Sequence, residues 1–205
     1  MSPMSEQHGV PGKRAAQGRA TRGQLIEVAT GLFAEHGYEG TSIEAVLAAA
    51  GVSRGALYHH FAGKEALFRA VVQAVSERVT TQLGEVIRDC TDPVDAVRTA
   101  ALAWIDLAGD PVIQRIELVD APSVLGAEEW HAMDEGRTVG VMREMLQAVS
   151  DAGHLPAEFV EPFAPMILAA LDEAAMTVAR SPDTRAAVAE SRRAVEELLN
   201  RLLRP

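Results

Sequence analysis

The sequence lacks the features of secreted and membrane proteins. Cys90 is the only cysteine among 205 residues, which excludes an internal disulfide framework and fits a reducing compartment. No N-terminal segment resembles a signal peptide, and no apolar run approaches the roughly 20 residues that a membrane span needs. Hydrophobic residues make up 48% of the chain, which favours a globular protein over a disordered one. We therefore expect a globular protein of the cytoplasm.

Several motifs of catalysis and of metal binding are missing as well. The chain has no phosphate-binding loop and no glycine pattern of a dinucleotide-binding fold. Its six histidines are scattered, and none is followed by another at the four-residue spacing of a helical metal site. Most carboxylates fall at positions that a helix would expose to solvent. We expect that the protein is not an enzyme and that it needs no metal and no cofactor.

The excess of negative charge lies in the second part of the chain. The formal net charge is −10. Residues 1–78 hold eight Lys/Arg and seven Asp/Glu, whereas residues 79–205 hold 11 basic and 22 acidic side chains. A nearly neutral N-terminal part can bind DNA through a local patch while an acidic body stays away from the polyanion. The same composition also fits an ordinary acidic surface.

The stretch that begins at Thr41 predicts two short helices joined by a tight turn. Thr41 and Glu44 have the spacing of a capping box at the start of the first helix. Gly51 stands where a helix ends in a left-handed residue, and Ser53 can cap a second helix of about residues 54–61. Such a pair is a helix-turn-helix, which places the start of its second helix in the major groove of DNA.

The residues predicted on the outer surface of this motif suit contact with DNA. They include a cation, small residues that allow close approach, and ring donors for phosphate oxygens. We predict that the groove is contacted by Arg54, Gly55, Ala56 and Tyr58, and that phosphates are held by Thr41, Ser42, His59, His60 and Lys64. Lys64 would also open the next helix, whose free amides form a positive end that favours a phosphate.

The same residues resemble a known family. The run GVSRGALYHHFAGKEALF from Gly51 to Phe68, preceded by LFAEHGYEGTSIEAV, closely resembles the DNA-binding domain of TetR-family transcriptional regulators. The similarity covers about residues 21–75. It implies a homodimeric, ligand-relieved repressor of a palindromic operator in double-stranded DNA, with the dimer interface formed by the last two helices. The residues alone leave open a helical small-molecule binding or interaction protein that does not contact DNA.

Helical periodicity continues to the end of the chain and predicts an all-α protein of about nine helices. Apolar residues recur every three or four positions in residues 21–36, 64–89, 128–152, 158–180 and 183–203, and after Asp92-Pro93. Residues 112–120 could be mistaken for a strand, but we predict a short helix that ends near Ala121-Pro122. Among the closing helices, Leu199 is expected in the dimer interface.

This pattern divides the chain into three parts. We expect a flexible arm at 1–20, a helix-turn-helix head at 21–66, and a ligand-sensing and dimerisation bundle at 67–205. Arg19 and Arg22 lie near the end of the arm, which either follows the DNA backbone or the minor groove, as homeodomain arms do, or is a solvated tail. In the resembled family, the long helix that begins at Lys64 transmits ligand binding to the head.

Large and adaptable side chains in the bundle predict a site for an apolar or amphipathic small molecule. Cavities between bundle helices are common ligand sites, and the resembled family usually has one there. The candidates are Trp104, Leu107, Trp130, Met133, Arg137, Met142, Phe163 and Met166. Asp106, Glu117 and Asp120 could orient the ligand. Each of these residues, taken singly, is explained as well by a place in the core or on the surface.

Overall fold

The protein is helical throughout the residues that its computed structural model describes. These are residues 11–203, and for residues 11–14, 127–129 and 131–137 only the backbone is described. The elements are α1 (Pro11–Gly40), α2 (Ile43–Ala50), α3 (Arg54–His60), α4 (Lys64–Ile87), α5 (Pro93–Leu107), α6 (Pro111–Ile113), the π-helix η1 (Gln114–Asp120), α7 (Ala121–Leu125), α8 (Ala127–Asp151), the 3-10 turn η2 (Ala157–Phe159), α9 (Val160–Arg180) and α10 (Thr184–Leu202). The predicted all-α class is confirmed.

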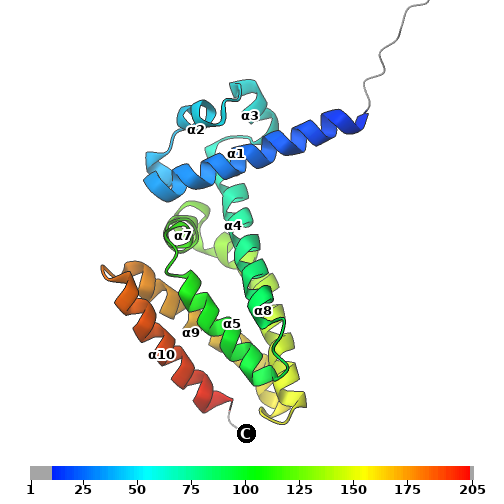
Figure 1. The fold of residues 1–205 in the computed structure, drawn as a ribbon, viewed down its shortest axis with the longest axis vertical. Coiled ribbons are helices and arrows are strands. Elements are labelled where there is room, and N and C mark those ends of the chain that lie inside the picture. The colour runs from blue at the N-terminus through cyan, green and yellow to red at the C-terminus, as the bar shows by residue number, and fades with distance from the viewer. Residues whose placement is uncertain (1–10, 204–205) are drawn as a thin grey trace, which may run out of the picture.

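The molecule is elongated, with a small head at one end of a helical body. Figure 1 shows α1, α2 and α3 grouped at the top, with α4 running from this head into the body. The body contains α5, α8, α9 and α10, which pack on one another. The long helix α4 is therefore the covalent link between the two parts, and it lies against both α1 and α5.

The head is held together by an apolar core that includes the first half of α4. Its members are buried and include Leu25, Phe33, Val46, Leu57, Leu67 and Phe68. The rings of Phe33 and Phe68 meet edge to face with centroids 5.0 Å apart, a favourable aromatic geometry. The same core continues into Ile113, Ile116 and Leu125 of the α6–η1–α7 segment. The head is thus packed on the body rather than tethered to it.

Helix α1 differs from the prediction at its N-terminal end. It begins at Pro11, so residues 11–20 of the expected arm are helical; residues 1–10 lie outside the described part. Alanines and a glutamine in this stretch favour a helix, although they carry no apolar period. At the other end, Gly37 has φ 72° and ψ 172°, which breaks the helix where the helical period of residues 21–36 ends, and one further turn follows to Gly40. The division at residue 20 stays a prediction.

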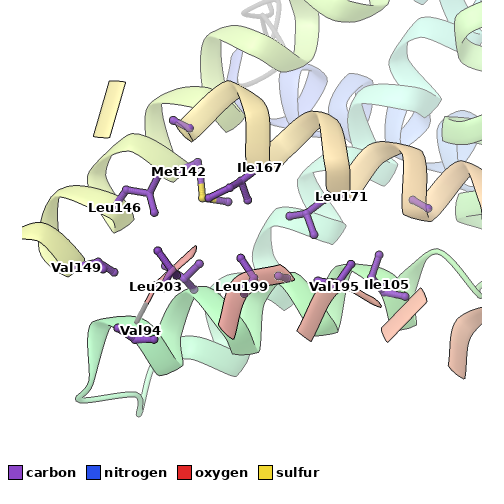
Figure 2. Packing of buried hydrophobic residues seen from close by; sticks show 14 of the residues in the cluster. Val94, Ile105, Met142, Leu146, Val149, Ile167, Leu171, Val195, Leu199 and Leu203 are labelled. Atoms are coloured by element: carbon purple, nitrogen blue, oxygen red, sulfur yellow. The ribbon is translucent and has the colours of Figure 1, made fainter. Parts of the chain in front are cut away.

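The body surrounds a second apolar core, in which α5, α8, α9 and α10 meet. Figure 2 shows side chains from all four helices pointing toward one another in this core. Ile105, Leu146, Ile167 and Leu199 are fully buried there. The predicted place of Leu199 in a dimer interface is therefore wrong. Leu199 lies on the inner face of α10 and belongs to the core of its own subunit.

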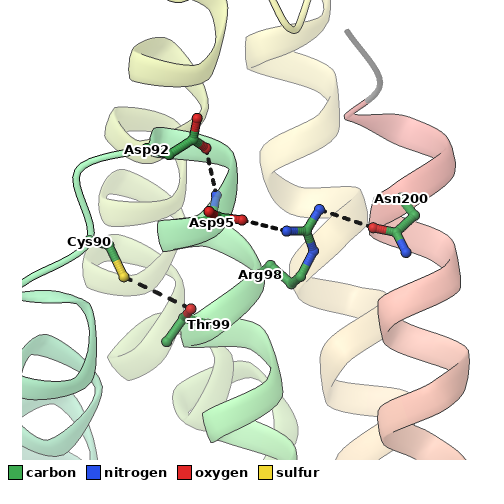
Figure 3. A network of polar contacts seen from close by, with 6 residues as sticks. All are labelled: Cys90, Asp92, Asp95, Arg98, Thr99 and Asn200. Carbon is green, nitrogen blue, oxygen red and sulfur yellow. Dashed lines mark hydrogen bonds and ion pairs between the residues drawn. The ribbon is translucent and has the colours of Figure 1, made fainter.

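A polar network fixes the start of α5 and ties it to α10. The Asp92 side chain accepts a hydrogen bond from the Asp95 backbone N–H at 2.9 Å, which caps the helix. Arg98 then pairs with Asp95 and donates from Nη2 to Asn200 Oδ1 of α10 at 3.0 Å (Figure 3). These contacts clamp the far end of the body, away from the head.

The segment from Pro111 to Leu125 is one helical stretch with a π-helix in its middle. The predicted helix at 112–120 is confirmed, but its predicted end at Ala121-Pro122 is wrong. Pro122 stands in the first turn of α7, where the missing N–H of proline is tolerated. Counting α6–η1–α7 as one helix gives nine helices in the described residues.

Helix α9 is apolar on more than its inner face. By length and composition the segment Ala157–Arg180, which contains α9, could cross a membrane, because an 18-residue window of it has a mean hydropathy of 1.3. The sequence had predicted no apolar run as long as a membrane span. Core helices of soluble proteins meet the same test. Only 28% of that segment is buried inside the subunit, and Met166 is 63% exposed. An apolar strip of α9 therefore remains uncovered in the single subunit.

Candidate DNA interface and sensor

The helix-turn-helix predicted from the sequence is present as α2, a turn and α3. Gly51 ends α2 with φ 64° and ψ 28°, the left-handed conformation expected of it. The Ser53 Oγ accepts a hydrogen bond from the Ala56 N–H at 3.2 Å and caps α3. Leu57 and Phe61 are buried, as predicted. The other residues of α3 are left at the surface, half-buried or exposed.

The cap of α2 is Ser42 rather than Thr41. The Ser42 Oγ accepts a hydrogen bond from the Ala45 N–H at 3.1 Å. The Thr41 hydroxyl instead donates to the carbonyls of Gly37 at 2.9 Å and Leu32 at 3.1 Å, and Thr41 is only 2% exposed. The predicted capping by Thr41 is wrong, and its burial leaves no room for the predicted phosphate contact. Thr41 fastens the end of α1 to the motif.

Ser53 also lies in a Gly-x-Ser-x-Gly sequence, residues 51–55. In hydrolases this pattern forms a nucleophile elbow between a strand and a helix. Here α2 and α3 flank the serine, and its Oγ is used as a helix cap. The local structure therefore gives the serine a capping role and not that of a nucleophile.

Arg54 stands at the start of α3 and is paired with α2. Its Nη2 lies 2.5 Å from Glu44 Oε1, and both side chains are largely exposed. Backbone hydrogen bonding and then the contact with Arg54 hold the pKa of the Glu44 carboxyl below its usual value. Because the pair lies in solvent, it can be exchanged for another acceptor at little cost. The guanidinium is thus held at the surface with a replaceable partner.

Gly55, Tyr58 and His59 complete the exposed face of α3, whereas Ala56 and His60 are half-buried. The rings of His59 and His60 lie edge to face, with centroids 5.1 Å apart. The His60 Cε1 is 3.8 Å from the position that a Cβ on Gly18 would take. The N-terminal part of α1 therefore passes beside the end of α3.

Lys64 opens α4 and lies beside the end of α1. Its Nζ is 4.2 Å from the centroid of the Tyr38 ring, a cation–π distance. Burial, followed by the nearby charges of Glu65 and Glu39, raises the pKa of the Tyr38 hydroxyl. No side chain caps the first turn of α4. The lysine and the first amides of α4 are therefore next to one another at one edge of the motif.

The predicted ligand residues fall into three groups. Leu107 and Trp130 are half-buried against the head-side core, and Trp104 packs on both cores. Met142 is buried in the body core, and Phe163 packs against that core with its ring stacked on Phe159, centroids 5.1 Å apart. Met133 and Arg137 lie outside the residues whose side chains are described.

Met166 does not join the other ligand candidates. It is the most exposed of the large hydrophobic residues described, and it points away from the body core. Its predicted place in a pocket is therefore wrong. Because α9 is apolar around most of its circumference, helical spacing could not tell which face turns inward.

Comparison with known proteins places this arrangement in a family. The profile described as "Bacterial regulatory proteins, tetR family" matches residues 25–71, and "Tetracyclin repressor-like, C-terminal domain" matches residues 94–202. Together they cover the head and the body. The chain belongs to the TetR family.

Solved structures of TetR-family proteins share the whole fold. A TetR-family transcriptional regulator from Pectobacterium atrosepticum is 32% identical, with a TM-score of 0.83 over 92% of this chain and 96% of that one. The fatty acid degradation regulator FadR from Bacillus halodurans is 21% identical, with a TM-score of 0.73 over 87% and 94% of the two chains. At that identity the second likeness shows the fold alone.

Curated relatives match over less than half of this chain. The transcriptional repressor AcnR of Corynebacterium efficiens is 42% identical over 65 residues, which are 32% of this chain and 35% of that protein. The matches to the first such relatives thus span about a third of their length.

Sequence patterns missed a polar contact between the body and the head of this TetR-family protein. The Asp120 Oδ2 accepts a hydrogen bond from the Tyr38 N–H at 2.7 Å, and the Arg115 Nε lies 3.2 Å from the same oxygen. Glu117, one turn earlier in η1, accepts a hydrogen bond from the Ser76 hydroxyl of α4. Both carboxylates had been considered as ligand contacts. They bind the head and α4 instead, across separations of 82 and 41 residues that local sequence patterns cannot register.

The third carboxylate considered for the ligand, Asp106, also has a protein partner. It pairs with Arg192, which joins α5 to α10. No group of three or more His, Cys, Asp or Glu side chains that could hold a metal ion occurs among the residues searched, which are those the structure describes.

Proposed function

We propose that this TetR-family protein is a sequence-specific DNA-binding regulator, a ligand-relieved repressor that acts as a homodimer on a palindromic operator. The observation that carries the proposal is the exposed face of α3, with Arg54 at its start and Lys64 at the neighbouring helix end. A binding role accounts for these residues without any catalytic step, in keeping with a family of regulators rather than enzymes. A cytoplasmic location follows from access to DNA.

Within this proposal, the start of α3 enters the major groove. Arg54 exchanges Glu44 for a guanine edge, since a guanidinium can donate two parallel hydrogen bonds to one guanine. Gly55 and the small side chain of Ala56 allow the helix to approach the bases, and Tyr58, 47% exposed, lies one turn further along. These four residues are the proposed groove contacts.

Phosphates are proposed to bind along the edges of the motif. Lys64 and the uncapped first turn of α4 offer a charge and backbone amides at one point. Ser42 and His59 are exposed and His60 is half-buried, so all three are at the surface of the motif. Thr41 is left out because its hydroxyl is buried and engaged. Such contacts set the register on DNA without selecting a sequence.

The dimer is proposed to form through the outer faces of α9 and α10. Met166 on α9 and Leu198 on α10 are large hydrophobic residues that the subunit leaves exposed. Two subunits related by a two-fold axis would cover these residues and place the two α3 helices in successive major grooves, about 34–36 Å apart. Leu199 has no part in this contact because it is buried in the subunit.

The effector is proposed to be an apolar or amphipathic small molecule that binds near the boundary of the two cores. Trp104 packs on both cores, and Leu107 and Trp130 pack beside it. The dimer would have a second conformation, in which the distance between its two heads does not fit the operator. A molecule that binds this conformation more tightly would shift the population away from the DNA-binding one. Met142 and Phe163 are in the adjoining body core and could close the far side of such a site.

Selection of bound fragments from the source genome tests the proposal. We expect the purified chain to enrich one palindromic sequence, and Arg54→Ala to weaken binding to it by about 1–3 kcal/mol while leaving non-sequence-specific binding nearly unchanged. Arg88→Ala, which changes an exposed arginine that pairs with Glu85 at the end of α4, is the matched control for loss of charge. If the wild-type chain enriched no sequence at low salt, the helical binding protein that does not contact DNA would be the better account.

A further inference from the structure

The contact between η1 and the end of α1 joins the body to the head at a single backbone amide. The Tyr38 N–H donates to Asp120 Oδ2 at 2.7 Å, and Arg115 holds the same carboxylate oxygen from the other side. The Asp120 side chain is 11% exposed and that of Arg115 is 44% exposed. A short hydrogen bond to a nearly buried carboxylate is one of the stronger polar contacts in a protein.

Gly37 makes room for this contact. A Cβ at Gly37 would lie 1.7 Å from Nη2 and 2.5 Å from Cζ of Arg115. The guanidinium therefore occupies the space where any other residue would carry a side chain. The positive φ of Gly37 breaks α1 at this point, which turns the Tyr38 N–H out of the helical ladder and toward η1.

Tyr38 carries the contact onward to the proposed DNA-binding edge. Its ring lies under the Lys64 Nζ at 4.2 Å and meets the Phe68 ring at 5.0 Å, so it touches the first two turns of α4. The Thr41 hydroxyl donates a hydrogen bond to the Gly37 carbonyl. The break in α1 at Gly37 therefore also fixes the start of the helix-turn-helix. The position of one amide thus bears on both DNA-contacting edges.

The other side of η1 faces the body. Glu117 accepts a hydrogen bond from Ser76 of α4, and η1 packs against α9 as well as α1 and α4. π-Helical turns are rare in proteins as a whole, but those that do occur are often found at functional sites. Any rearrangement of this turn moves Asp120 relative to Tyr38.

We propose that the Arg115–Asp120 pair positions the head on the body, and that operator affinity depends on its hydrogen bond to Tyr38. This inference rests on the proposed function, since it names what orients the DNA-binding head. With the contact in place the two heads of a dimer keep one separation. Without it the two heads sample several separations. The operator affinity is then reduced in proportion to the fraction of dimers whose head separation fits the operator.

Two substitutions of Asp120 and one control test the proposal. Asp120→Ala removes both contacts, whereas Asp120→Asn keeps an oxygen that can accept from Tyr38 but removes the charge that faces Arg115. The control is Asp106→Ala, which removes an aspartate that also pairs with an arginine, but whose pair joins α5 to α10 and not η1 to α1. Urea unfolding first establishes that each variant remains folded.

Two measurements are made on the full chain. The first, on the protein without DNA, is the rate of hydrogen exchange in the peptide that contains the Tyr38 amide. Titration with the selected operator duplex and with an unrelated duplex of equal length reports affinity. We expect Asp120→Ala to speed exchange about tenfold at this peptide and to weaken operator binding by about fivefold or more, with unrelated DNA unaffected. Asp120→Asn should be intermediate in both, and Asp106→Ala should match the wild type.

The results separate this inference from the proposed function. Unchanged exchange in Asp120→Ala would overturn the inference whether or not an operator exists. Faster exchange with operator affinity within twofold of the wild type would reduce the pair to a structural contact and overturn the positioning role. If the wild-type chain bound no operator, the proposed function itself would fail and the positioning role in DNA binding with it.

Discussion

Substitution of Gly37 by alanine is the sharpest test of the geometry at the end of α1. Gly37 has φ 72° and ψ 172°, a region that is essentially restricted to glycine. The added methyl group would also overlap the Arg115 guanidinium, 1.7 Å from Nη2. Alanine therefore meets two separate obstacles, one in the backbone and one in a neighbouring side chain.

The size of the effect can be worked from these two obstacles. The backbone conformation costs a non-glycine residue about 1–3 kcal/mol. The displaced guanidinium is partly exposed and can swing away, so loss of its pair with Asp120 adds about 0–1 kcal/mol. Alanine lowers the entropy of the unfolded chain, which returns about 0.4–1 kcal/mol. We expect Gly37→Ala to lower the free energy of unfolding by about 2 kcal/mol, the centre of a range of about 0–3.6 kcal/mol, which is a shift of about 4–8 °C in Tm.

Urea unfolding of the chain at one fixed subunit concentration measures this difference. Gly31→Ala is the matched control, because Gly31 is an exposed residue of the same helix with no atom within 4 Å of an added Cβ. It should raise stability by about 0.5–1 kcal/mol. The double variant Gly37→Ala/Arg115→Ala isolates the steric term, since truncating Arg115 removes the overlap and leaves only the backbone strain.

The two glycines must behave differently for the reasoning to hold. If Gly37→Ala and Gly31→Ala unfolded at the same urea concentration, the break in α1 at Gly37 would be refuted. If the double variant were no more stable than expected from adding the single changes, the close approach of Arg115 would be refuted while the backbone strain stood.

Three further substitutions probe the head and the dimer. Glu44→Gln releases Arg54 and removes a negative charge from the DNA-facing side, so operator binding in gel shifts should tighten about two- to fivefold; weaker binding would contradict the exchange of partners. Lys64→Ala should weaken binding to all sequences alike and lower the slope of log affinity against log salt by about 1; a change of specificity with the slope intact would contradict a phosphate role. Met166→Glu should give folded monomers in light scattering, and an unchanged mass would exclude α9 from the interface.

Much of the head could be predicted because its signals are local. Gly51 and Ser53 each determine a helix boundary through their own conformation or side chain, and both act as predicted. The assignment of Thr41 as a cap failed because Thr41 and Ser42 are neighbouring hydroxyls, and either could cap α2. The carbonyls of Leu32 and Gly37 decide between them, and those contacts exist only once α1 is folded against the motif.

The body shows where sequence patterns stop being informative. Helical spacing found α9 and α10 but placed Met166 inside and Leu199 at the dimer interface, whereas Met166 is exposed and Leu199 is buried in its own subunit. Such errors arise because an apolar residue on either face has the same spacing. The pairing of Asp120 with Tyr38 joins residues 82 positions apart, which no period in the sequence marks.

The central claim is that two α3 helices of one dimer contact two half-sites of an operator. Native mass spectrometry of the protein with the selected duplex tests it directly, since each chain adds 21.9 kDa. The account predicts an even number of chains on each duplex, and much weaker binding when one half-site is scrambled. A saturated complex with a single chain, or equal affinity for the half-site duplex, would contradict it.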